Sequence, residues 1–185
     1  MAMWMVLGVV ALLAVWAVMT YNSLVGLKNQ VENGWKQIDV QLKRRHDLIP
    51  NLVATVKGFM QFEQETLEKV IEARQAAVSA EGVQATSAAE GALTQSLGKL
   101  FALAESYPEL KSNQNVLQLQ EELTATENKI AFARQFYNDV VMRFNTAQEV
   151  FPTNLLALRL GFKRAEFFEA EEAVRVVPAV DLSIN

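Results

Sequence analysis

The chain has 185 residues, of which 17 are basic and 21 acidic, and it contains no cysteine. The lack of cysteine excludes disulfide bonds and thiolate metal sites. An acidic distal part without clusters of Lys and Arg argues against nucleic acid as a partner. The residues beyond the apolar N-terminal stretch are numerous enough for one sizeable core.

The first element is an apolar segment, residues 3–21, with no charge and no proline. As a helix it rises roughly 28 Å, close to the ~30 Å hydrocarbon thickness of a bilayer. Trp4 lies near one end, and Trp16 and Tyr21 near the other, as in membrane-interface aromatic belts. We therefore predict a retained transmembrane anchor. A cleaved secretory signal and a buried core helix are the alternatives, but the start is not basic and Ala17-Val18-Met19 matches a cleavage site poorly.

Charge is distributed unevenly along the rest of the chain. Residues 22–60 carry six basic and three acidic side chains, a balance of +3, whereas residues 61–185 carry eleven and eighteen, a balance of −7. Lys and Arg close to a membrane helix stay on the cytoplasmic side. This distribution predicts an N-terminus outside the cell and a body in the cytoplasm.

The segment after the anchor has apolar residues spaced as in a coiled-coil seam, at Leu24, Val31, Trp35, Ile38 and Leu42. No proline precedes Pro50, so we expect the membrane helix to continue to about His46. Asp47 then has the character of an N-cap, with Pro50 in the first turn of a second helix that runs to about Ala80.

Two further helices are expected. The third spans roughly Thr86–Ser106 and ends at Tyr107-Pro108, because proline disfavours helix in the residue before it. The fourth ends at Phe151-Pro152, and its apolar seam keeps three- and four-residue spacing throughout, at Val116, Leu119, Leu123, Thr126, Ile130, Ala133, Tyr137, Val140, Phe144 and Ala147.

Together these elements predict an all-α fold. An N-terminal transmembrane helix runs into an antiparallel up-down bundle of four long helices, followed by a short helix and an extended tail. The expected domains are an anchor at residues 1–21, a helical bundle at 22–152, and the short helix and tail at 153–185. Strand-like alternation occurs only at residues 174–180. The tail from residue 165 to 185 is either disordered or lies on a neighbouring subunit.

Charged residues interrupt or flank the apolar seams at five positions: Glu63, Arg74, Glu105, Glu127 and Arg134. We interpret them as ion pairs that set helix register. Solvated helix faces are an alternative. A di-metal carboxylate site needs Glu-x-x-His on two helices, and the single histidine, His46, does not supply it.

Motifs for chemistry are missing from the sequence. There is no G-x-S-x-G, no phosphate-binding glycine loop and no H-E-x-x-H. One histidine and no cysteine also remove the common acid–base and nucleophile arrangements. We therefore predict no enzyme activity, no catalytic, cofactor-binding or metal-binding residues, no cofactor and no small-molecule substrate.

The basic run Lys43–Arg45 has two interpretations. We favour a solvated helix end near the negative pole of its own dipole, and contact with anionic headgroups is the alternative. A second recurring feature is the pair Tyr-Asn, which occurs at Tyr21-Asn22 and at Tyr137-Asn138. Asparagine forms hydrogen bonds across helices, so we expect the two pairs to meet near the membrane surface.

Several short motifs recur in a defined order between the anchor and about Phe168: Tyr21-Asn22, Trp35, Gln41–Arg45, Asp47–Val53, Val56–Gly58, Glu63, Ala73-Arg74, Ala104–Lys111, Leu119-Gln120, Glu127–Ile130, Ala133-Arg134, Tyr137-Asn138, Asn145 and Phe151-Pro152. In order and spacing they resemble the LemA family of bacterial membrane-anchored helical proteins. Phe62 departs from the family, which commonly has histidine there. The resemblance implies an N-out anchor in the bacterial cytoplasmic (inner) membrane, an antiparallel helical body in the cytoplasm, and no catalytic mechanism.

We therefore expect a membrane-anchored, non-catalytic helical scaffold that self-assembles, organises other membrane proteins, or does both. The regular seam of the fourth helix, the many alanines and the apolar tail favour this function. An accessory or regulatory subunit of a separate membrane enzyme, such as a protease, is the alternative. The expected partners are the lipid bilayer, further copies of the chain and other membrane proteins.

Overall fold

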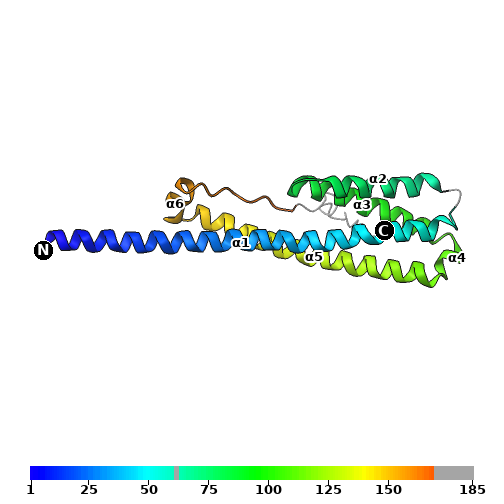
Figure 1. The fold of residues 1–185 in the computed structure, drawn as a ribbon, viewed down its shortest axis with the longest axis horizontal. Coiled ribbons are helices and arrows are strands. Elements are labelled where there is room, and N and C mark those ends of the chain that lie inside the picture. The colour runs from blue at the N-terminus through cyan, green and yellow to red at the C-terminus, as the bar shows by residue number, and fades with distance from the viewer. Residues whose placement is uncertain (61–62, 169–185) are drawn as a thin grey trace, which may run out of the picture. The chain divides into compact units, whose positions relative to one another are not determined.

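The computed structural model describes residues 1–60 and 63–168, and all regular structure in these residues is helical (Figure 1). The predicted all-α fold with a long apolar N-terminal helix is confirmed. Phe62 and the strand-like residues 174–180 lie outside the described residues. The six helices of this part of the chain are α1 (Ala2–Lys57), α2 (Gln64–Ser79), α3 (Val83–Ala104), α4 (Pro108–Lys111), α5 (Gln114–Glu149) and α6 (Thr153–Arg159).

The chain divides into two compact units. The first unit comprises residues 1–44 and 125–167, and the second comprises residues 45–124 together with Phe168. Helices α1 and α5 therefore contribute residues to both units, whereas α2, α3 and α4 belong to the second and α6 to the first.

The break predicted at Asp47 is wrong, because α1 continues through Pro50 to Lys57. The second helix predicted from Pro50 to about Ala80 is also wrong at its start, since α2 begins at Gln64. A proline inside a helix has no N–H to donate, and it leaves the carbonyl four residues earlier without its helical partner. That carbonyl belongs to His46, and Nε of Arg74 in α2 donates a hydrogen bond to it at 2.7 Å. Since the freed carbonyl has a partner, the helix persists through the proline.

The N-terminal part of α1 is long and apolar enough to cross a membrane. Its most apolar 18-residue window has a mean hydropathy of 2.4, and none of that window is buried. Large side chains such as Leu12 are 72% exposed there. A continuous apolar surface of this size is unfavourable in water. A helix that crosses a bilayer needs such a surface, because its side chains contact the hydrocarbon of the lipid.

The second unit has one hydrophobic core, to which five helices contribute. Its helix ends are set by local chemistry. Gly82 has φ +84°, a conformation that suits glycine, and it precedes α3. The side-chain Oδ1 of Asn113 caps α5 by accepting from the N–H groups of Asn115 and Val116. The core residues are Ile49, Leu52, Val53, Val56, Met60, Leu67, Val70, Ala77, Leu93, Leu97, Leu100, Ala104, Leu110, Val116 and Leu123.

In the first unit, α5 packs against α1 along the predicted seam. The ring of Tyr137 lies 5.7 Å from that of Trp35, and a Cβ added to Gly34 would be 3.4 Å from Tyr137 Cα. Gly34 lies twelve residues beyond Asn22, a helical rise of about 18 Å. The predicted meeting of Tyr21-Asn22 with the Tyr-Asn pair of α5 is therefore wrong within one chain.

The short helix predicted after residue 152 is present as α6, and residues 160–167 then run back along α5. Asn145 forms two hydrogen bonds with Ala165: its Nδ2 donates to the carbonyl at 2.9 Å, and its Oδ1 accepts from the N–H at 2.8 Å. The hydroxyl of Tyr137 donates to the carbonyl of Glu166 at 2.8 Å. We call residues 160–167 the strap. The beginning of the predicted tail thus lies on its own chain, and residues 169–185 lie outside the described residues.

Candidate functional site

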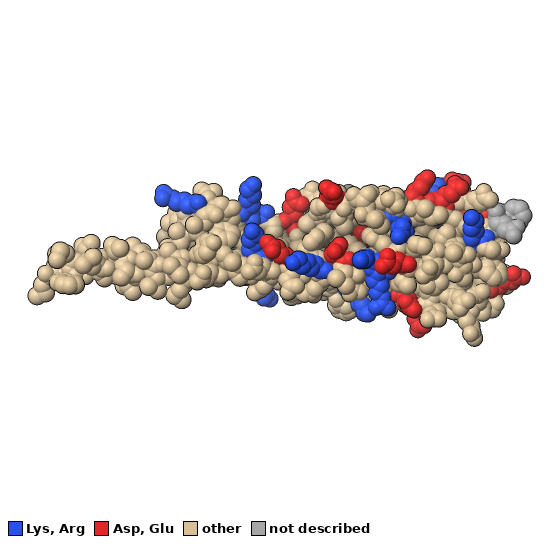
Figure 2. Space-filling model, viewed as in Figure 1, with Lys and Arg blue, Asp and Glu red and all other residues tan. Residues whose placement is uncertain are grey.

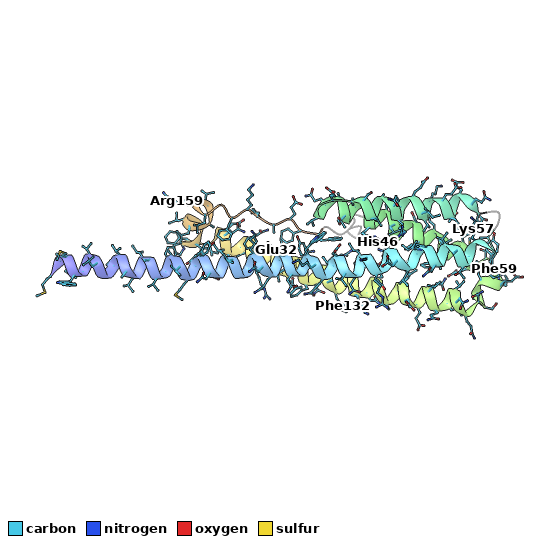
Figure 3. The ribbon with its side chains drawn as sticks, in the orientation of Figure 1. Glu32, His46, Lys57, Phe59, Phe132 and Arg159 are labelled. Carbon is cyan, nitrogen blue, oxygen red and sulfur yellow. The ribbon has the colours of Figure 1, made fainter. Side chains whose placement is uncertain are left out.

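A buried ion-pair cluster connects α1 and α3 in the second unit. Arg45 and Glu90 are each only 4% exposed, and Nη1 of Arg45 lies 3.1 Å from Oε2 of Glu90. Nη2 of Arg45 donates to Oγ1 of Thr94 at 2.8 Å. Nε2 of His46 lies 2.5 Å from the other carboxylate oxygen of Glu90. Figure 3 labels His46 on α1.

Burial of this cluster has a clear energetic consequence. An ionised side chain that is removed from water is stabilised only when opposite charges and hydrogen bonds replace its hydration. Both oxygens of Glu90 have a partner, and the hydroxyl of Thr94 also donates to the Glu90 carbonyl at 2.9 Å. Because each partner comes from a defined turn of its helix, the cluster holds α1 and α3 in one axial register.

The cluster is not arranged for catalysis. The side chains of His46 and Glu90 are only 12% and 6% exposed, so a substrate has no direct access to them. The nearby hydroxyl, that of Thr94, is fully engaged in hydrogen bonds. Across residues 1–60 and 63–168, no group of three or more His, Cys, Asp or Glu side chains is placed to hold a metal ion. The absence of a cofactor remains a prediction.

The five charged residues predicted from the seams have different environments. In the second unit, Arg74 is half-buried and bonds to the His46 carbonyl, whereas Glu105 is exposed. Glu63 accepts a hydrogen bond from the hydroxyl of Tyr107 at 3.3 Å. Burial raises the pKa of Tyr107, and the negative charge of the Glu63 carboxylate raises it further. The two remaining residues, Glu127 and Arg134, belong to the first unit and are half-buried.

Sequence reasoning missed Arg45 and Glu90 as core residues, and the solvated helix end predicted for Lys43–Arg45 is wrong for Arg45. Lys43 and Arg44 are exposed, but Arg45 is buried. A signal was present in the spacing. Ile38, Leu42, Arg45 and Ile49 follow one another by four, three and four residues, as do Thr86, Glu90, Leu93 and Leu97. Charged residues at seam positions were the indication that both are buried.

The first unit carries an exposed apolar groove on α1 and α5, with a volume of about 600 Å³. Phe132 is 73% exposed, Val40 61% and Phe136 44%, and Figure 3 shows Phe132 projecting from α5. Oε1 of Gln41 is buried in the groove wall, and no described residue donates a hydrogen bond to it. We call this surface the Phe132 groove. It is lined by Asn33, Lys36, Gln37, Val40, Gln41, Lys129, Phe132, Ala133 and Phe136.

In residues 1–60 and 63–168 the protein is all-helical, and its N-terminal helix is long and apolar enough to cross a membrane. The chain belongs to the LemA family, whose family model matches residues 34–182.

Named relatives support this assignment. The chain is 30% identical to Protein LemA of Metamycoplasma hominis over 157 residues, which cover 84% of this chain and 71% of that protein. It is 27% identical over 194 residues to Magnetosome protein MamQ 2 of Paramagnetospirillum magneticum, covering 91% of this chain and 71% of the relative. Magnetosome protein MamQ of Magnetospirillum gryphiswaldense is 25% identical over 181 residues, which cover 84% of this chain and 66% of the relative.

Proposed function

We propose that this protein is a non-catalytic helical scaffold of the bacterial inner membrane that associates with further copies of itself. The observation that carries the proposal is the Phe132 groove, an apolar surface on the unit that also contains the anchor. Apolar surfaces of this kind on a folded protein mark interaction sites.

The partner that fits the Phe132 groove best is a second copy of the chain. Phe132 lines the groove and is 73% exposed, so one surface presents both an exposed ring and a hollow. Such a surface is complementary to itself across a two-fold axis. Contact would remove Phe132 and Val40 from water, and it would bring polar groups of the partner toward the buried oxygen of Gln41.

We further propose that α1, α2, α3 and α5 form an antiparallel up-down bundle, within the domain limits 1–21, 22–152 and 153–185. The shared core of the second unit and the short connections between the helices support this arrangement.

Lys28 and Lys36 follow the anchor closely, and the chain has no acidic residue before Glu32. This charge pattern supports an N-terminus outside and a body in the cytoplasm.

The test uses the full chain in native-like membranes. Because the protein has no cysteine, Lys129→Cys introduces a single thiol at an exposed position that lines the Phe132 groove on α5, and it leaves Phe132 and Phe136 in place. Under mild oxidation we expect a disulfide-linked dimer to accumulate rapidly. Met142→Cys, at a position that is 53% exposed on the same helix but outside the groove, is the matched control and should form little dimer.

A second measurement uses the particle mass after extraction in mild detergent. We expect particles heavier than one 20.6 kDa chain with its micelle, and dissociation when Phe132 and Phe136 are both replaced by Ser. A monodisperse monomer together with equal crosslinking at positions 129 and 142 overturns the proposal. A stoichiometric foreign protein in place of the second copy also overturns it, and that result favours an accessory subunit of a membrane enzyme such as a protease.

A further inference from the structure

Helix α6 and the turn before it expose a row of apolar side chains. Phe151 is 79% exposed, Leu155 59% and Leu158 85%. Leu155 and Leu158 are three residues apart in α6 and lie on one face of the helix, whereas Phe151 is exposed in the turn before it. Ala157 is 2% exposed and lies on the opposite, inward face of α6. A seven-residue helix with this distribution buries one side and leaves the more apolar side outward.

This apolar face lies level with the end of the membrane-spanning segment. The ring of Phe162, just after α6, contacts the ring of Tyr21 with centroids 6.0 Å apart. A cleft of about 620 Å³ is lined by α1 residues including Tyr21 and by residues 160–163. Figure 1 shows α6 beside this part of α1. Residues 1–15 of α1 are all exposed, but Trp16 is partly buried.

The depth of Tyr21 in a bilayer follows from helix geometry. If Leu12 marks the centre of the segment, Tyr21 lies about 14 Å from the midplane, at the edge of the ~30 Å hydrocarbon layer. The residues that contact Tyr21 therefore lie where the acyl chains meet the headgroups. Amphipathic helices that bind membrane surfaces insert at this same depth.

The segment that contains α6 carries basic side chains, and the acidic residues Glu149 and Glu166 lie just outside it. Residues 150–165 contain three basic side chains and no acidic one. Arg159 and Lys163 are exposed, and Arg164 pairs with Glu149 at 2.9 Å. On the face shown in Figure 2, no acidic side chain is visible on the part of the first unit that extends from the anchor to α6. This charge distribution is complementary to anionic lipid headgroups.

We propose that α6 is a second membrane contact, which lies in the headgroup region of the bilayer that α1 spans. Phe151, Leu155 and Leu158 enter the boundary of the acyl chains, while Arg159 and Lys163 bind the phosphates of anionic lipids. The inference rests on α1 spanning the membrane but not on self-assembly. Two contacts at one end of the first unit, a spanning helix and a surface helix, fix the rotation of α1 about its own axis.

The experiment uses the full chain reconstituted into vesicles with single cysteines that carry a small environment-sensitive fluorophore. The test position is Leu158→Cys. Val10→Cys, in the anchor, reports whether α1 is in the bilayer. Asn128→Cys is the matched negative control, because it is exposed on α5 of the same unit and lies about 24 Å along the helix from Phe144, which contacts Phe162.

The readout is quenching by phospholipids that carry a nitroxide on the acyl chain. The nitroxide is near the headgroup end for positions 128 and 158, and near the end of the chain for position 10, which lies about 3 Å along the helix from Leu12. We expect strong quenching at positions 10 and 158, and several-fold weaker quenching at position 128. Quenching at position 158 should fall when Leu155 is replaced by Asp. In vesicles that contain phosphatidylglycerol it should exceed that in pure phosphatidylcholine, and Arg159→Gln with Lys163→Gln should remove this difference.

Three results overturn the proposal. If position 10 is quenched and position 158 is not, α1 spans the membrane and α6 stays in water. If the fluorescence at position 158 depends on protein density and not on the quencher lipid, another copy of the chain covers α6. If position 10 is not quenched either, the membrane span itself fails, and the second contact fails with it.

Discussion

The two units of the chain place their unusual side chains in opposite environments. The second unit buries charge: Arg45 and Glu90 lie in its interior and are paired through several short contacts. The first unit exposes apolar side chains, on the Phe132 groove and on α6. Buried charge without a partner and a large exposed apolar surface each raise the free energy of the folded protein.

The two units differ in which groups compensate for this unfavourable free energy. In the second unit, the partners of the buried charges come from the same chain. In the first unit, the exposed apolar groups have no such partner among the described residues of the groove and α6, and we assign them to a second copy and to lipid. Only the strap, held by Asn145 and Tyr137, closes part of this unit. The comparison therefore separates a structural unit from an interacting one.

The largest effect is expected from removing one side of the buried ion pair. Glu90→Leu leaves Arg45 charged and without its carboxylate, which typically costs about 3–5 kcal/mol. The free energy of unfolding, measured by denaturant titration in detergent, should fall by that amount. Adding Arg45→Met to the same chain should recover most of the loss, because two apolar side chains then replace the pair. A double variant that is no more stable than Glu90→Leu contradicts the role of the pair.

A smaller effect tests the link between Arg74 and Pro50. Arg74→Met leaves the His46 carbonyl without its donor, and we expect a loss of about 1–3 kcal/mol in unfolding free energy. In a Pro50→Ala background the same substitution should cost clearly less, since the backbone N–H that alanine restores at position 50 then donates to that carbonyl. Equal costs in the two backgrounds would show that Arg74 does not replace the hydrogen bond that Pro50 removes.

In the first unit, Asn145→Leu removes both hydrogen bonds that hold Ala165 in the strap. We expect a loss of about 1–2 kcal/mol and faster amide hydrogen exchange at Ala165, measured by mass spectrometry. Asn145→Asp keeps the acceptor for the Ala165 N–H but not the donor to its carbonyl, so an intermediate effect is expected. Unchanged exchange at Ala165 in Asn145→Leu would mean that other contacts hold the strap.

The smallest effect is a pH dependence that arises from Tyr137. Burial, and secondarily the charge of Glu166, raises the pKa of its hydroxyl above the usual value. The folded state therefore favours the protonated phenol, and the stability that this group contributes is present below its ordinary pKa of about 10 and is lost as the pH rises through the folded value. The stability difference between wild type and Tyr137→Phe, about 1 kcal/mol at neutral pH, should shrink in alkaline solution. A constant difference argues against titration of Tyr137 in this range.

The sequence determined the secondary structure of most of the described chain. Strict spacing of apolar residues located the seam of α5, where Ile130, Tyr137 and Phe144 are buried as predicted. Tyr107-Pro108 and Phe151-Pro152 marked the ends of α3 and α5. These features are local, because helix periodicity and the steric demands of proline act over a few residues, and so the sequence alone reveals them.

Only the tertiary structure decided the features that depend on residues distant in the sequence. Pro50 ends a helix in most contexts, but Arg74, 24 residues away, supplies the missing hydrogen-bond partner of the His46 carbonyl and the helix continues. A charged side chain such as Arg45 is expected at the surface, and its burial is favourable only because Glu90 pairs with it. The position of α6 near the end of the apolar segment depends on the contact between the rings of Phe162 and Tyr21, which are far apart in the sequence. In each case the free energy of a group depends on its neighbours in space, and spacing along the chain does not specify those neighbours.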